Sequence, residues 1–74
     1  MSEKHIEMQM VESSNIRAIG YDKEEKTLFV QFKNYNEFSF EGVPKETHDA
    51  LMAAESVGKY FHSHIKGKFK TTRV

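Results

Sequence analysis

The chain has 74 residues, with 11 Lys and Arg balanced by 11 Asp and Glu, and it contains no cysteine. Its length is that of one domain, and the lack of cysteine excludes disulfides and thiolate-based zinc sites. It has no apolar run of about 18 residues to span a membrane, and its polar start is unlike a signal peptide. We therefore expect a soluble cytoplasmic protein.

The first ten residues are interpreted separately from the rest of the chain. Ile6, Met8 and Met10 alternate with polar side chains, a period of two that favours extended backbone. We interpret residues 1–10 as an N-terminal arm or short strand. Residues 11–74 are assigned to a single domain.

Three segments with a period of two follow, at residues 16–21, 27–33 and 37–41. Large apolar residues share a face in the last two segments: Leu28, Val30 and Phe32, then Phe38 and Phe40. In the first segment, strict alternation places Ile16 on the face opposite Ile19. The segments are joined by short polar stretches, so they predict an antiparallel meander.

Two helices are predicted after the meander. Pro44 suits the first position of a helix over residues 44–55. Apolar and small residues form one stripe along it: Val43, Thr47, Ala50, Leu51 and Ala54. Ser56 is a good N-cap for a shorter second helix, and Gly67 is suited to close that helix. Its core-facing residues, spaced four apart, are Val57, Phe61 and Ile65.

The residues after Gly67 have β character and are expected to return to the sheet edge or to lie across the sheet. The predicted fold class is α+β. It comprises a small antiparallel sheet of three to four strands, two short helices packed against it, and a basic C-terminal extension.

Charge is unevenly distributed along the chain, because all 11 acids precede Lys59 and five basic residues lie from Lys59 onward. A basic strip interleaved with aromatic residues is typical of nucleic-acid binding. The residues predicted to bind nucleic acid are Lys59, Tyr60, Lys66, Lys68, Lys70 and Arg73. A solvated face balanced by acids from other strands is the alternative interpretation.

Metal binding and catalysis are both disfavoured. His62 and His64 lie two apart, so on a helix they point away from each other and cannot share an ion. Ser63 is adjacent to both, which prevents the serine–histidine hydrogen bond of a catalytic triad. We assign no catalytic residue, metal ligand or cofactor.

Eight short fragments together resemble a known family. In order they are 13–16, 19–22, 28–34, Val43-Pro44, Ala50-Leu51, 58–61, 65–67 and Arg73-Val74. This combination resembles the KTSC domain, which occurs at the C-terminus of some lysyl-tRNA synthetases and as free-standing bacterial proteins. The family carries a Tyr-x-Tyr motif where this chain has Phe38-Ser39-Phe40, so both hydroxyls are missing here. The resemblance implies a fold of this size and raises the expectation of RNA binding.

The expected function is therefore that of a small non-enzymatic module that binds nucleic acid, RNA preferred, through its basic C-terminal part. A protein-interaction or accessory domain that uses its helical or acidic face is the alternative. A monomer or a weak homodimer is expected, with no membrane partner.

Overall fold

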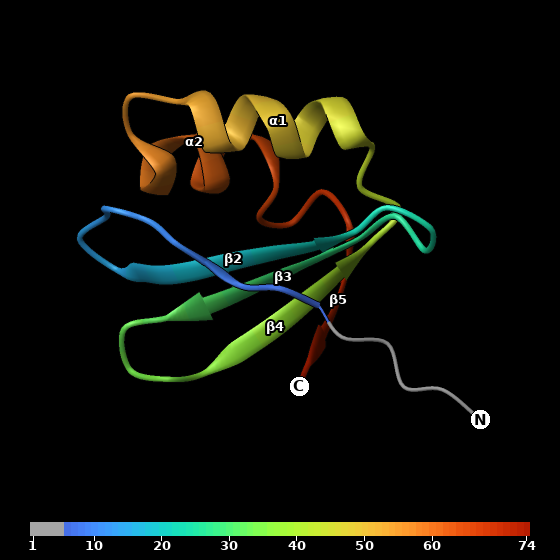
Figure 1. The fold of residues 1–74 in the computed structure, drawn as a ribbon, viewed down its shortest axis with the longest axis horizontal. Helices are drawn as coiled ribbons and strands as arrows, with labels where there is room; N and C mark the ends of the chain where they lie inside the picture. The colour runs from blue at the N-terminus through green and yellow to red at the C-terminus, as the bar shows by residue number, and fades with distance from the viewer. Residues whose placement is uncertain (1–5) are drawn as a thin grey trace.

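The computed structural model describes residues 6–74, which form five strands and two helices. In chain order these are β1 (Gln9–Met10), β2 (Ile16–Asp22), β3 (Thr27–Phe32), β4 (Glu37–Glu41), α1 (Lys45–Ala53), α2 (Val57–His64) and β5 (Lys70–Arg73). The strands form one antiparallel sheet in the order β1-β2-β3-β4-β5, and both helices cover the same face of it (Figure 1). The α+β class is confirmed.

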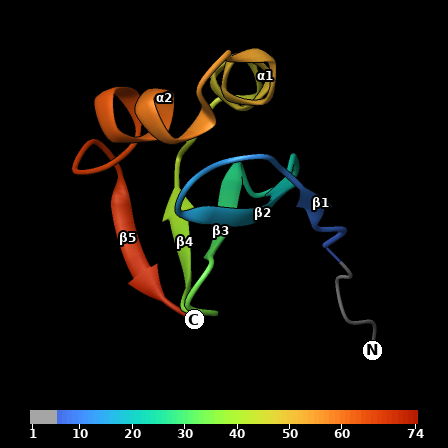
Figure 2. The ribbon, with the colours of Figure 1, turned by 90° about the vertical axis from the view of Figure 1, so that its left-hand side faces the viewer.

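The sheet has five strands rather than the three to four that were predicted. Within the predicted N-terminal arm, β1 pairs with β2 at one edge, while residues 1–5 lie outside the described part of the chain. The basic C-terminal extension forms β5, which pairs with β4 at the other edge (Figure 2). The sequence left β5 undecided because both helices separate it from its partner, so no short turn specifies the pairing.

A register shift in β2 corrects the predicted faces of that strand. Ile16 pairs with Phe32 and Ala18 with Gln31, which leaves Arg17 as an extra residue. A bulge of this kind interrupts the alternation of side chains. As a result Ile16 and Ile19, which strict alternation had separated, are both fully buried.

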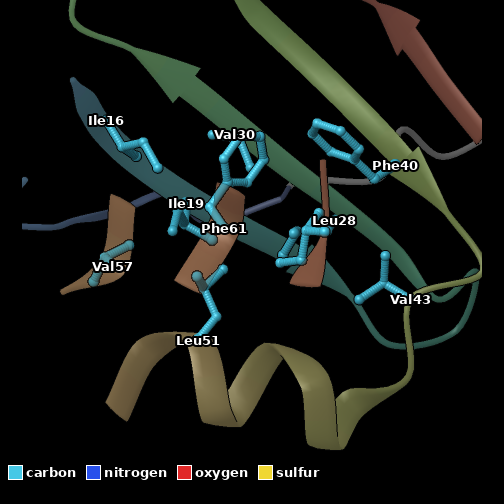
Figure 3. Close-up of a cluster of buried hydrophobic side chains, with 10 residues drawn as sticks. Ile16, Ile19, Leu28, Val30, Phe40, Val43, Leu51, Val57 and Phe61 are labelled. Carbon is cyan, nitrogen blue, oxygen red and sulfur yellow. The ribbon is translucent and has the colours of Figure 1, made fainter. Parts of the chain in front are cut away.

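The helices pack on the sheet through one cluster of buried apolar side chains (Figure 3). Its members are Ile16, Ile19, Leu28, Val30, Phe40, Val43, Leu51, Val57, Phe61 and Ile65. The Phe61 ring meets the rings of Phe32 and Phe40 edge to face, with centroids 5.6 and 5.4 Å apart. The predicted inward spacing of Val57, Phe61 and Ile65 is confirmed.

Phe38 and Phe40 both lie on the helix-covered side of β4. Phe40 is 3% exposed, and half-buried Phe38 packs against the margin of the core. The Phe38 ring also meets the Phe32 ring, at a centroid distance of 5.8 Å. These rings are therefore used in packing.

α1 begins one residue later than predicted. Pro44 has a ψ of 152° and serves as the N-cap rather than as the first helical residue. Leu51 is buried, but Ala50 is exposed although it was placed on the apolar stripe. The buried side of α1 is instead turned toward His48 and Met52, which are half-buried beside Leu51, and Met52 packs against the core.

The substitution Phe61→Ala tests how far the fold depends on the aromatic contact between α2 and the sheet. Phe61 is 4% exposed, so its truncation should lower the free energy of unfolding by about 3–5 kcal/mol. Urea denaturation followed by circular dichroism measures this change. Val74→Ala, at a position that is 68% exposed, is the control and should leave the midpoint nearly unchanged. Equal midpoints for the two variants would contradict the packing described here.

Candidate functional site

The position of α2 determines where the basic residues of the C-terminal part point. Ser56 caps the helix, because its Oγ accepts a hydrogen bond from the Lys59 backbone N–H at 3.3 Å. Lys59 is exposed on the side of α2 that faces away from Phe61 and the core. Lys66 is also exposed, but it lies past the end of α2 at His64, where helix periodicity no longer fixes its direction.

Two features extend this basic surface. Gly67 has a φ of 77° and reverses the chain after α2, and the next residue, Lys68, is exposed. Half-buried Tyr60 stacks on exposed His64, with ring centroids 4.2 Å apart and an angle of 16° between the rings. We call Lys59, Lys66 and Lys68 the α2 cations.

The two predicted basic residues of β5 lie on opposite faces of the sheet. Arg73 pairs with Phe38, on the helix-covered face, whereas Lys70 pairs with Glu41, whose side chain lies on the other face. Arg73 Nη2 donates a hydrogen bond to Asn36 Oδ1 at 3.1 Å. The predicted residues are thus divided between elements: Tyr60 and the α2 cations lie on or just after α2, whereas Lys70 and Arg73 lie on opposite faces of β5.

A polar depression of about 310 Å³ adjoins the start of α2. It is lined by Ser13, Ser14, Asn15, Ser56, Gly58, Lys59 and His62. A Cβ on Gly58 would lie 3.1 Å from Ser13 Oγ and from Asn15 Oδ1, so glycine allows the loop before β2 to pack closely on the helix. Ser13 Oγ also accepts the backbone N–H of Ile16 at 3.3 Å. The hydrogen bonds of Ser13 order the loop itself, and the small size of Gly58 lets it approach α2.

A larger cleft, of about 450 Å³, lies between α1 and the β1 edge of the sheet. It is lined by Ile6, Glu7, Gln9, Ile19, Gly20, Tyr21, Asp22, Lys23, Glu24, Lys45, His48 and Asp49. One wall is the Tyr21 ring stacked on the His48 ring, with centroids 4.7 Å apart. The Tyr21 hydroxyl donates a hydrogen bond to the Val43 carbonyl oxygen at 2.6 Å.

Charged groups on α1 are paired at the mouth of this cleft. Lys45 Nζ lies 2.9 Å from Asp49 Oδ2, and His48 Nδ1 lies 3.3 Å from Asp49 Oδ1. The hydrogen bond from Lys45 lowers the pKa of Asp49, while burial raises the pKa of the Tyr21 hydroxyl. Sequence reasoning missed this site, because Tyr21 and His48 meet only when α1 folds over β2.

The described residues offer no alternative site built on a metal. Residues 6–74 contain no group of three or more His, Cys, Asp or Glu side chains positioned to hold a metal ion. None of the helices described is long and apolar enough to cross a membrane.

Comparison with known proteins identifies the family. The model of the KTSC domain matches residues 12–69. The chain belongs to the KTSC domain family. The crystal structure of a KTSC domain protein from Yersinia pestis matches with a TM-score of 0.91 and 37% sequence identity, covering 95% of this chain and 99% of that one.

Relatives of this KTSC domain occur in two sizes. A protein from Tsukamurella paurometabola is 41% identical over 63 residues, which cover 85% of this chain and 94% of that protein. A lysine–tRNA ligase from Trichormus variabilis is 37% identical over 59 residues, which cover 80% of this chain but only 10% of the ligase. The domain is thus similar both to a protein of its own length and to a small part of a larger enzyme.

The variant Tyr21→Phe tests the wall of the cleft. Loss of the hydrogen bond to Val43 should cost about 0.5–1.5 kcal/mol of stability near neutral pH. Because the pKa of Tyr21 is raised on folding, the contribution of its hydroxyl is present below pH ~10 and is lost as pH rises further. The difference in urea midpoint between wild type and Tyr21→Phe should therefore narrow from pH 8 to pH 11.

Tyr35→Phe, at an exposed turn position, is the matched control for removal of one phenol. A difference for Tyr21→Phe that stays constant across this pH range would show that the hydroxyl is not held as described.

Proposed function

We propose that this KTSC domain is a non-enzymatic module that binds nucleic acid, RNA preferred, through the outer surface of α2. The observation that carries the proposal is the grouping of three exposed lysines, the α2 cations, on and just after one helix. No acidic residue follows Glu55 in the chain, so no neighbour in sequence neutralises them. Exposed lysines close together in the chain can neutralise neighbouring phosphates of a nucleic-acid backbone.

The distribution of charge limits how the domain would bind. The acids are concentrated before Lys59, so a nucleic acid would be attracted to one side of the molecule and repelled from others. Phosphate contacts fix orientation but carry no sequence information. We therefore expect weak, oriented and largely sequence-independent binding.

The relatives support a connection with RNA. A similar stretch of 59 residues lies within a protein named lysine–tRNA ligase, which is named for a reaction that involves tRNA. An appended basic module would raise the local concentration of a phosphate-bearing substrate. For the present chain this association supports the choice of RNA as the first ligand to test.

A protein-binding function is the second candidate, favoured by the cleft between α1 and the β1 edge. The cleft combines an apolar floor at Ile19 with an aromatic wall and charged groups of both signs. Such a mixture is typical of surfaces that recognise side chains of a protein partner. This cleft lies beside α1 rather than α2, so a test of the α2 cations separates the two functions.

Charge reversal of all three α2 cations to Glu tests the proposal. Three phosphate contacts predict a slope of about −2 for log affinity against log salt, since each contributes about −0.7 for a single strand. Wild type should therefore lose about twentyfold in affinity for a mixed-sequence RNA between about 50 and 200 mM salt. The variant should show little binding at either concentration, as measured by fluorescence anisotropy.

The matched control reverses Lys23, Lys26 and Lys33 to Glu, which changes net charge equally at exposed turn positions outside α2. This control should retain most of the wild-type affinity and salt dependence. Equal loss in both triple variants would indicate a general charge effect and not a site on α2. Absence of wild-type binding at about 50 mM salt would overturn the nucleic-acid proposal. Protein binding would then be the function to test next.

A further inference from the structure

We propose that the stacked Tyr60–His64 pair on α2 is a platform for an unpaired base, so that the ligand of this surface is single-stranded nucleic acid. The inference rests on the function proposed above. It adds that the domain contacts a base of the nucleic acid as well as its phosphates. It is carried by the geometry of the ring pair and by its position beside the α2 cations.

The rings of Tyr60 and His64 are arranged so that a third flat ring could stack on them. The centroids are 4.2 Å apart and the rings are nearly parallel, at 16°. Tyr60 is half-buried against the core, whereas His64, one helical turn further on, is exposed. A base placed on the outer side of His64 would extend the stack by one ring, and every base has a flat face able to do so.

The ring pair is flanked in the chain by the α2 cations. Lys59 directly precedes Tyr60 on α2, with the two side chains about 100° apart around the helix axis, and Lys66 follows His64 by two residues. Lys59, opposite the buried side of α2, and Lys66, just past its end, are both exposed. A strand whose phosphates contact these lysines could turn a base toward His64 without leaving the helix. Aromatic rings beside a basic track are the usual combination in proteins that bind single strands.

The other aromatic sites of the domain fit this role less well. Tyr21 stacks on His48 in a similar way, but its hydroxyl is held by Val43 and the pair lines the cleft beside α1. Phe29 lies on the sheet face that the helices leave uncovered, where Glu37 and Glu41 flank it on β4. Acidic side chains beside a base platform would repel the phosphates next to that base.

Base pairing determines which ligand can use the platform. In a duplex, bases stack on their neighbours within the helix, and double-stranded RNA is read mainly through its shape and backbone. Unpaired bases can turn outward and stack on aromatic side chains. His64 should therefore contribute to the binding of single strands and not to the binding of duplexes.

The experiment compares two single-stranded probes that carry the same number of phosphates. One is an oligoadenylate RNA of about ten nucleotides, within the usual size of a single-strand site, and the other is an RNA of equal length without bases. Wild type should bind the oligoadenylate about tenfold more tightly, as expected for one stacked base. His64→Ala should reduce this preference to near unity and leave the affinity for the abasic RNA unchanged.

Three further measurements complete the test. His64→Phe, which keeps a ring, should restore the preference, and His62→Ala, an exposed histidine on another side of α2, should leave it intact. A blunt RNA duplex should bind wild type and His64→Ala equally. Thermal melting of each variant shows whether it is folded before its affinities are compared.

The outcomes separate this inference from the function on which it rests. Equal wild-type affinity for the two single-stranded probes would overturn the base platform, while salt-dependent binding of both would leave the phosphate-binding function intact. A preference that survives His64→Ala, or a duplex affinity that falls with it, would also overturn the platform. Absence of binding to either probe would overturn both proposals.

Discussion

The packing of Phe61 between α2 and the sheet is the contact on which the remaining arrangement depends. With no cysteine, the chain has no disulfide, and the clustered rings of Phe32, Phe40 and Phe61 join the two layers. Because the inward side of α2 is filled by this contact, Lys59, the lysine of this helix, has to face solvent. A buried residue therefore sets the direction of the candidate binding surface.

Pairing of β5 with β4 is the second constraint, and it divides what looked like one basic strip. A continuous run of cations in a sequence becomes a continuous surface only if the backbone keeps them on one side. Lys59 lies on α2, whereas Lys66 and Lys68 follow the end of the helix and are exposed in the turn there. The strand places Lys70 and Arg73 on opposite faces, because positions separated by three alternate between faces.

Local patterns in the sequence predicted most of the fold. The meander of β2 to β4, the Ser56 cap and the inward spacing of α2 depend on neighbouring residues, and all were anticipated. Contacts between distant segments were not, since they depend on how the elements dock. The bulge at Arg17, the pairing of β5 and the meeting of Tyr21 with His48 are of this kind. For the candidate site, the basic residues could be named from the sequence, but not the opposite faces on which β5 places Lys70 and Arg73.

The two free surfaces of this KTSC domain follow from its small size. Two helices cover only one face of the sheet, and each helix uses one side for the core. The exposed side of α2 presents Lys59 and the stacked ring pair. The cleft near His48 lies beside α1. Because these surfaces belong to different helices, a nucleic acid on α2 would leave the cleft accessible. The two functions proposed above, binding to RNA and binding to a protein, are therefore compatible within one domain.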